Sequence, residues 1–263
     1  HAFRDRVRLS GVNSINWARI VAQVVYYFAA GAALGAPQRA ARYVVPTGNF
    51  GDVFAGHVAR RMGLPVSELV VATNVNDILE RTIRTGRYEV TGVVATSSPS
   101  MDIQVSSNFE RLLFDAHGRD AGAVRRMMSG LAQSKSFTIA DPALAAIRAE
   151  FRAGRADEAE VSGMIRATLE EAGYLLDPHT AVGMVAARKV AADPAVPTVV
   201  LSTAHPAKFP DAVEAASGTR PALPAWLGDL MEREERMVLL PNDQAAVETY
   251  VLEKTRAAVA GAA

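Results

Sequence analysis

The stretch VVPTGNFGDVFAGHVARR, residues 44–61, decides how this chain is built. Two β-branched residues, Val44 and Val45, run into a loop that holds Gly48 and Gly51, and a helical pattern follows at once. Glycine can adopt φ > 0 and carries no Cβ, so a ligand can approach this backbone closely. The helix that follows offers unpaired N–H groups and the positive end of its dipole. The spacing indicates an anion site, although an ordinary strand-to-helix turn would use the same glycines.

Outward from this glycine loop (residues 46–52), β-branched runs alternate with helical patterns. The alternation predicts an α/β fold, a three-layer parallel sheet with helices on both faces. Ligands of such sheets bind beyond the carboxyl ends of the strands, where the glycine loop and Ser202–His205 both lie. The expected strands are 42–45, 69–73, 198–202 and 236–240, and the expected helices are 13–30, 52–62, 77–84, 107–114, 121–134, 142–153, 158–172, 177–192, 206–216 and 243–260.

Helix-capping residues mark the starts of three of these helices. Asn13 or Ser14 is the expected cap of the first helix, and Ser106 or Ser107 is the expected cap of the helix that ends at residue 114. Asp177 precedes a proline at the first helical position, which is a typical opening of a helix.

Length and composition are those of a soluble globular protein. The chain has 263 residues, 49% of them hydrophobic, and its 28 basic residues balance 28 acidic ones. A net charge of zero gives no support to a nucleic-acid or membrane surface. The absence of cysteine excludes disulfides and thiolate metal sites. The most apolar run, residues 20–37, is short for a membrane span and contains Gln23, so it predicts a buried helix.

Five blocks resemble the threonine synthases of the bacterial and fungal type, in the same order and over nearly the whole chain. The blocks are SGVNSINWARI (10–20), PTGNFGD (46–52), SSPSMDIQVSSNFERLLF (97–114), DPHTAVG (177–183) and LSTAHPAKF (201–209). The resemblance implies fold type II of the pyridoxal-phosphate enzymes, in the tryptophan-synthase-β-like group. It further implies a cytoplasmic enzyme of threonine biosynthesis that converts O-phosphohomoserine and water to threonine and phosphate.

The same resemblance assigns a cofactor site. It implies that backbone N–H groups of Gly48, Asn49, Phe50, Gly51 and Asp52 cradle the 5′-phosphate of pyridoxal phosphate. Because a carboxylate facing that phosphate is unfavourable, we expect Asp52 to turn away and cap backbone N–H groups.

A hydroxyl at the end of a late strand completes the expected cofactor site. The resemblance implies that Thr203 lies beside the pyridine nitrogen, since related enzymes place a Ser or Thr hydroxyl there. The alternative is that Thr203 only ends a strand.

For the substrate, the resemblance implies a phosphate site made by Asn13, Ser14 and Arg19. A helix N-terminus together with a guanidinium suits a dianion, and the alternative is a capped helix with a solvated arginine. His205 and Lys208 follow Thr203 and contact substrate phosphate or carboxylate, or else have no catalytic role.

Two further residues rank lower as site candidates. Asn16 lies in the same block as the proposed phosphate site, and His179 begins a helix where it lines the pocket or serves only the cap.

Covalent catalysis with pyridoxal phosphate needs a lysine. The chain has four, Lys135, Lys189, Lys208 and Lys254, and none fits the family's Schiff-base position, which precedes the first block. We therefore expect the carboxyl-terminal part of a threonine synthase with no catalytic residue of its own, inactive when isolated. Residues 1–36 would end the small domain and form a crossover helix, and residues 37–263 would belong to the large domain.

Two other functions stay open at this point. One is a related pyridoxal-phosphate lyase or dehydratase acting on hydroxy or phospho amino acids, and the other is a non-catalytic phosphate-binding or interaction domain. For the threonine synthase function, the expected partner is the small-molecule substrate O-phosphohomoserine, without metal, nucleic acid or membrane, and the oligomeric state is left open.

Overall fold

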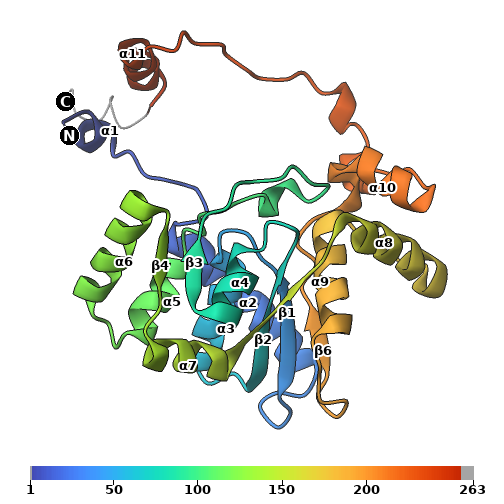
Figure 1. Ribbon diagram of the computed structural model, residues 1–263. Helices are drawn as coiled ribbons and strands as arrows, with labels where there is room; N and C mark the ends of the chain where they lie inside the picture. The colour runs from blue at the N-terminus through green and yellow to red at the C-terminus, as the bar shows by residue number, and fades with distance from the viewer. Residues whose placement is uncertain (1, 256–263) are drawn as a thin grey trace. The chain divides into compact units, whose positions relative to one another are not determined.

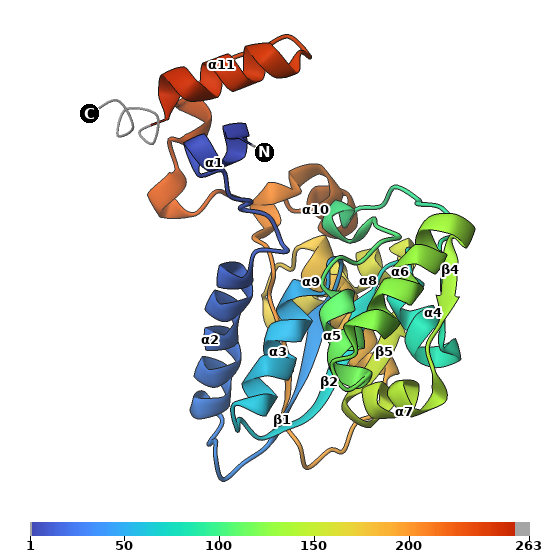
Figure 2. The ribbon, with the colours of Figure 1, turned by 90° about the vertical axis from the view of Figure 1, so that its left-hand side faces the viewer.

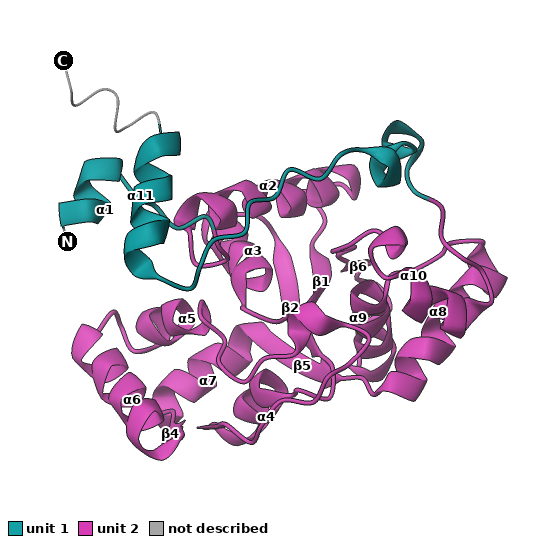
Figure 3. Ribbon diagram, turned by 90° about the horizontal axis from the view of Figure 1, so that it is seen from above, with its two compact units in different colours: residues 1–12, 223–263 teal, residues 13–222 magenta. Residues whose placement is uncertain are grey.

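The computed structural model describes residues 2–255 and divides the chain into two compact units (Figure 3). Residues 13–222 form the larger unit, and residues 1–12 with 223–263 form the smaller one. The larger unit holds every residue for which a binding role is expected. The domain boundary expected between residues 36 and 37 stays a prediction.

A four-stranded parallel sheet is the centre of the larger unit (Figure 1). The strands are β1 (Ala41–Pro46), β2 (Val66–Thr73), β5 (Phe151–Arg155) and β6 (Thr198–Val200), in the order β5-β2-β1-β6. Val44 of β1 is opposite Val70 of β2 and Val200 of β6. Every residue of β1 is buried, as expected for a strand covered on both faces. The predicted α/β fold is confirmed.

Alternate residues of β1 and β2 enter two different cores. Tyr43 and Val45 pack with α2 (Trp17–Ala33) and α3 (Gly51–Arg61), whereas Val44 packs with α8 (Glu158–Ala172) and α9 (Pro178–Lys189). Side chains that alternate across a strand produce this division. Figures 1 and 2 show the two helical layers on opposite sides of the sheet.

The remaining elements of the larger unit surround this sheet. A short antiparallel pair, β3 (Arg87–Glu89) and β4 (Ser136–Thr138), was not expected, because strands of three residues are too short to show an alternating pattern. The other elements are α4 (Ile78–Thr85), α5 (Phe109–Ala116), α6 (Ala121–Ser134), α7 (Asp141–Glu150), α10 (Pro210–Ser217) and the 3-10 helices at Pro99–Met101 and Pro206–Lys208.

Several expected boundaries are corrected by the structure. The helix expected over 142–153 ends at Glu150, and β5 follows it directly, because pairing with β2 overrides the helical pattern. Asn16 caps α2 by accepting from Ala18 N, since residues 13–16 form a turn. Asn108 precedes α5 in place of Ser106 or Ser107. The cap at Asp177 is confirmed.

The smaller unit contains α1 (Ala2–Val7) and α11 (Gln244–Lys254), with 3-10 turns at Ala225–Leu227 and Leu230–Glu232. The strand expected over 236–240 is wrong: these residues are exposed and form no ladder with any strand among the described residues. The closing helix ends at Lys254, and the rest of its expected span, 256–260, lies outside the described residues. Within residues 2–255, no helix has the length and apolar character needed to cross a bilayer.

Candidate active site

The glycine loop presents a row of backbone donors at the carboxyl end of β1. The N–H of Thr47 is used, since it donates to Ala72 O at 2.8 Å. The next six N–H groups, those of residues 48–53, donate to no acceptor in the described part of the chain. They lie at the N-terminus of α3, where the helix dipole is positive. The loop is therefore built to receive an anion.

The two glycines serve the loop in different ways. A Cβ on Gly48 would lie 2.4 Å from the carbonyl oxygen of Ser100, so only glycine fits there. A Cβ on Gly51 would make ordinary contacts, 3.5 Å from Asn108 Nδ2 and 3.6 Å from Ser14 O.

The left-handed residue of the loop is not a glycine. Neither Gly48 nor Gly51 has positive φ, so the conformational reason given for them from the sequence is wrong. Phe50 takes that conformation instead, with φ 63°, and its buried ring packs 5.3 Å from Phe109 and 5.8 Å from Phe151. Packing of this ring holds a backbone geometry that a bulky residue otherwise avoids.

A cavity of about 140 Å³ lies against these donors and joins two groups of expected site residues. Its lining consists of Ser14, Arg19 and Gln23 together with residues 46–53. The Arg19 guanidinium makes no hydrogen bond or ion pair with any described residue, so it is free to bind a ligand. Asn13 does not line the cavity, and its Oδ1 accepts from Ile15 N at 3.2 Å.

Asp52 also lines this cavity and pairs with a tyrosine of α2. The Tyr27 hydroxyl donates to Asp52 O at 2.8 Å and approaches Asp52 Oδ1 at 3.3 Å. Burial raises the pKa of Asp52 to about 6, while the hydrogen bond from Tyr27 acts in the opposite direction. No described backbone N–H donates to the Asp52 carboxylate, so the expectation that it caps such groups is wrong.

Thr203 follows β6, whose carboxyl end neighbours that of β1. Leu201 N donates to Val44 O at 3.0 Å, which fixes this neighbourhood. Thr203 N donates to Thr180 Oγ1 at 3.3 Å, and its own hydroxyl bonds to no described residue. The hydroxyl is therefore available at the expected edge of the sheet, and its role beside a cofactor stays a prediction.

His205 caps the 3-10 turn Pro206–Lys208 that follows Thr203, and Lys208 ends it. His205 Nδ1 accepts from Ala207 N at 3.1 Å, and the Lys208 ammonium lies 5.9 Å from the centre of the Phe209 ring. Neither residue lines the 140 Å³ cavity. Their contact with a substrate stays a prediction.

His179 positions the backbone that packs on Gly48. Its Nε2 accepts from Ser100 N at 3.2 Å, so Nδ1 carries the proton and donates to Asp177 Oδ1 at 3.0 Å. Asp177 Oδ2 accepts from the Thr180 hydroxyl, which in turn accepts from Thr203 N. The capping motif revealed Asp177 in the sequence, but Ser100 lies too far along the chain for any local pattern to show this contact.

A buried polar cluster after β2 was missed altogether. Asn74 is fully buried, and its Nδ2 donates to Asp102 Oδ1 at 2.8 Å. Asn76 Nδ2 and Thr96 Oγ1 donate to the same oxygen at 2.9 and 2.7 Å. The cluster fixes residues 94–102 over the end of β2. The segment NVND (74–77), directly after the buried strand, was the signal that could have indicated it.

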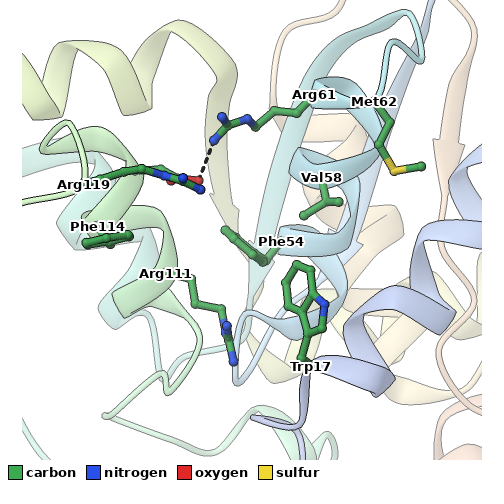
Figure 4. A pocket seen from close by; sticks show the side chains of 9 residues that line it. Trp17, Phe54, Val58, Arg61, Met62, Arg111, Phe114 and Arg119 are labelled. Atoms are coloured by element: carbon green, nitrogen blue, oxygen red, sulfur yellow. Dashed lines mark hydrogen bonds and ion pairs between the residues drawn. The ribbon is translucent and has the colours of Figure 1, made fainter. Parts of the chain in front are cut away.

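A second cavity, of about 420 Å³, opens between α3 and α5 (Figure 4). It contains no residue of the glycine loop, and no sequence pattern indicated it. Arg61 donates to Asp115 Oδ2 at 2.8 Å, and the Arg111 guanidinium lies 5.4 Å from the centre of the Trp17 ring. The lining residues are Trp17, Phe54, Val58, Arg61, Met62, Arg111, Phe114, Asp115 and Arg119.

None of the four lysines lines either of these two cavities. Lys135 ends α6, Lys189 pairs with Glu160, and the Lys254 ammonium lies 5.8 Å from the Tyr250 ring. With Lys208 above, none lines the 140 Å³ cavity. Among residues 2–255, no group of three or more acidic or histidine residues is arranged to hold a metal.

The sequence of this chain is similar to those of known threonine synthases. Residues 180–251 match the family described as threonine synthase, C-terminal. The chain is 52% identical to threonine synthase of Pseudomonas aeruginosa over 250 residues, which cover 95% of this chain and 53% of that relative. It is 42% identical to the threonine synthase of Methylobacillus glycogenes over 259 residues, 96% of this chain and 54% of the relative.

Solved structures agree with the sequence relatives. The crystal structure of pyridoxal-phosphate-bound threonine synthase from Brucella melitensis superposes with a TM-score of 0.93 at 60% identity, over 97% of this chain and 55% of that one. Threonine synthase from Escherichia coli gives a TM-score of 0.69 at 33% identity, over 95% of this chain and 52% of that one. The chain thus spans about half the length of the relatives that it matches.

The fold and the loop together define a class, that of parallel α/β domains with a backbone anion site at the end of a central strand. Within this class the chain is related to the threonine synthases and matches their carboxyl-terminal part. The resemblance stated from the sequence is confirmed, and so is the fold that it implies.

Proposed function

We propose that this chain supplies the cofactor-phosphate cradle and the substrate-phosphate site of a pyridoxal-phosphate-dependent threonine synthase. The reaction is conversion of O-phosphohomoserine and water to threonine and phosphate. The observation that carries the proposal is the row of six N–H groups, residues 48–53, with no acceptor in the described chain beside a 140 Å³ cavity. A phosphate dianion suits such a row because several donors share its charge. A related structure of the same fold is pyridoxal-phosphate bound.

The residues present fit the cofactor's phosphate end. Gly48, Asn49, Phe50, Gly51 and Asp52 would hold it through backbone N–H groups, and the Thr203 hydroxyl would lie at the pyridine nitrogen. When bound, the cofactor supplies an electron sink that acidifies C–H bonds of the substrate.

For the substrate, Ser14 and Arg19 would hold the phosphate group, with Asn13 shaping the turn before α2. A guanidinium adds a charge-assisted contact to the neutral backbone donors. His205 and Lys208 are second-rank candidates for the substrate phosphate or carboxylate. Because no lysine lines the cavity, the proposal assigns the lysine that anchors the cofactor to a part of the enzyme outside these 263 residues.

The first test is reconstitution of the full-length enzyme with pyridoxal phosphate, followed by assay with O-phosphohomoserine, O-phosphothreonine and threonine. The proposal predicts a cofactor absorbance band and turnover of O-phosphohomoserine to threonine. Deamination of threonine or O-phosphothreonine without threonine synthesis would show a lyase or dehydratase. Absence of any cofactor band would show a non-catalytic phosphate-binding domain.

A second test separates substrate binding from cofactor binding. Arg19→Ala should leave the cofactor spectrum unchanged and lower kcat/KM for O-phosphohomoserine about ten- to a hundredfold, since a hydrogen bond to a charged group contributes about 1.5–3 kcal/mol. Arg125→Ala, which removes an exposed arginine of α6, is the matched control. An unchanged kcat/KM in the Arg19 variant would remove this residue from the site.

A further inference from the structure

Asn108 joins the two segments that form the cavity. It is fully buried, and its Nδ2 donates to Ser14 O and to Asn49 O, both at 2.9 Å. Its backbone N–H donates to Asn49 O as well, at 3.1 Å. One side chain therefore binds the segment before α2 and the glycine loop at the same time.

The orientation of this amide is fixed by its neighbours. Both Nδ2 hydrogens have carbonyl acceptors, and Oδ1 accepts from Arg111 Nε at 3.1 Å. Turning the amide over would put Oδ1 against two carbonyl oxygens and its NH₂ against a guanidinium. All the donors and the acceptor of the Asn108 amide are thus used in one arrangement.

Arg111 extends the same link to the start of α2. Its Nη2 donates to Ile15 O at 3.0 Å, and its guanidinium lies 5.4 Å from the centre of the Trp17 ring. Figure 4 shows the Arg111 side chain directed toward Trp17 at the edge of the larger cavity. Both hydrogen bonds of Arg111 go to neutral acceptors. Arg111 therefore holds Asn108 and Ile15 in position and does not neutralise a charge.

The contacts of the 106–108 segment with the glycine loop also orient the backbone N–H groups of that loop. In a trans peptide the C=O of one residue points opposite to the N–H of the next. Ser106 Oγ donates to Gly48 O at 2.8 Å, and Asn108 holds Asn49 O. The N–H groups of Asn49 and Phe50 consequently point away from the 106–108 segment, and two carbonyl dipoles are kept off the anion.

We propose that Asn108, supported by Arg111, is a positioning residue that sets the spacing between the cofactor-phosphate loop and the substrate-phosphate segment. Asn108 does not line the cavity and touches neither phosphate, so it acts through Asn49 and Ser14. This inference rests on the proposed function, because it concerns the same two phosphate subsites.

The test compares pyridoxal phosphate with pyridoxal, which lacks the phosphate, in the full-length enzyme. In Asn108→Ala, Ser14 O and the Arg111 Nε–H lose their partner, while Asn49 O keeps only the backbone N–H of residue 108. We therefore expect affinity for pyridoxal phosphate to fall about tenfold or more, with little change for pyridoxal. KM for O-phosphohomoserine should rise by a similar factor, and by more than kcat falls. A merely structural role would weaken both cofactor forms together.

Arg111→Lys is the second variant, since it keeps the charge and loses the planar fork that reaches both Asn108 and Ile15. We expect it to raise KM for O-phosphohomoserine severalfold, and it decides the question if Asn108→Ala does not fold. Arg125→Lys on α6 is its control.

The outcomes are distinct from those of the proposed function. Failure of the wild-type enzyme to bind pyridoxal phosphate would contradict the proposed function. A wild-type enzyme that binds it, with an unchanged preference for pyridoxal phosphate over pyridoxal in Asn108→Ala and an unchanged KM in Arg111→Lys, would overturn the positioning role alone.

Discussion

At the scale of single residues, the glycine loop divides its requirements among different side chains. Gly48 is fixed by a backbone that packs on it, Gly51 leaves room beside the donors, and the buried Phe50 takes the left-handed geometry. Asp52 places a carboxyl group in the same cavity, where burial raises its pKa to about 6. Substitutions of Gly48, Gly51 and Asp52 should therefore have different effects on stability and on cofactor binding.

The two glycines should respond differently to substitution. Gly48→Ala puts a methyl group 2.4 Å from Ser100 O, so we expect the free energy of unfolding to fall by about 1–3 kcal/mol. In Gly51→Val the Cβ has room, but the branches occupy the cavity, so affinity for pyridoxal phosphate should be lost while stability changes by less. Chemical denaturation and cofactor titration of both variants measure this. Wild-type cofactor affinity in Gly51→Val would contradict the assignment of the loop.

Asp52 should make stability depend on pH in a defined window. Its pKa rises from 3.8 to about 6 on folding, so its contribution is present below about pH 4 and is lost as pH rises to 6. Asp52→Asn removes this loss. We expect the variant to gain about 3 kcal/mol relative to wild type between pH 4 and 6, with no further gain above. Unfolding free energies at pH 4, 5, 6 and 7 test this, and parallel curves for the two proteins would refute it.

At the scale of helices and strands, the sequence predicted elements whose pattern is local. The helices at 121–134 and 158–172 have the expected bounds, because Asp120 and Asp157 cap them and their apolar spacing is regular. Strand β5 was missed because a helical pattern continues through Phe151, and only its pairing with β2 makes it extended. The apolar run at 236–240 suggested a strand, yet a strand needs a partner that no local pattern supplies.

The candidate site was likewise predictable only where its residues carry a local sequence pattern. The loop and the start of α2 each carry a local signal, so Ser14, Arg19 and the glycine loop were named and do meet in one cavity. Asn108, Arg111 and the Asn74–Asp102 cluster were not named, because their contacts join segments far apart in the chain. Contacts of this kind depend on the folded sheet and leave no spacing to detect.

The segment that packs on Gly48 should loosen when its buried cluster is broken. Asp102→Ala leaves the amides of Asn74 and Asn76 without their shared acceptor, so we expect a loss of about 3 kcal/mol in unfolding free energy. Amide hydrogen exchange should rise over residues 94–102. Asp193→Ala, at an exposed carboxylate, is the control. Equal stability of the two variants would contradict a structural role for the cluster.

At the scale of the whole molecule, α2 presents apolar residues on two sides. Ile20, Val24 and Tyr27 enter the core, whereas Val21 and Val25, four residues apart, are 48% and 62% exposed. The described residues leave this second stripe uncovered, and Trp17 at 48% exposure continues it. Apolar stripes of this kind promote association.

The stripe should therefore control the behaviour of the purified 263-residue chain. We expect the chain alone to self-associate, and Val21→Lys combined with Val25→Glu to shift it toward monomer without lowering the melting temperature. Sedimentation velocity over a range of protein concentrations gives the answer. A wild-type chain that stays monomeric at all concentrations would show that the stripe needs no cover.

In the proposed function, the backbone of the glycine loop binds the cofactor's phosphate. The most direct measurement is a crystal structure of the full-length enzyme with pyridoxal phosphate. We expect phosphate oxygens within hydrogen-bond distance of N–H groups from residues 48–52, with Arg19 left free for the phosphate of the substrate. A cofactor phosphate bound elsewhere, with these N–H groups facing only water, would contradict it.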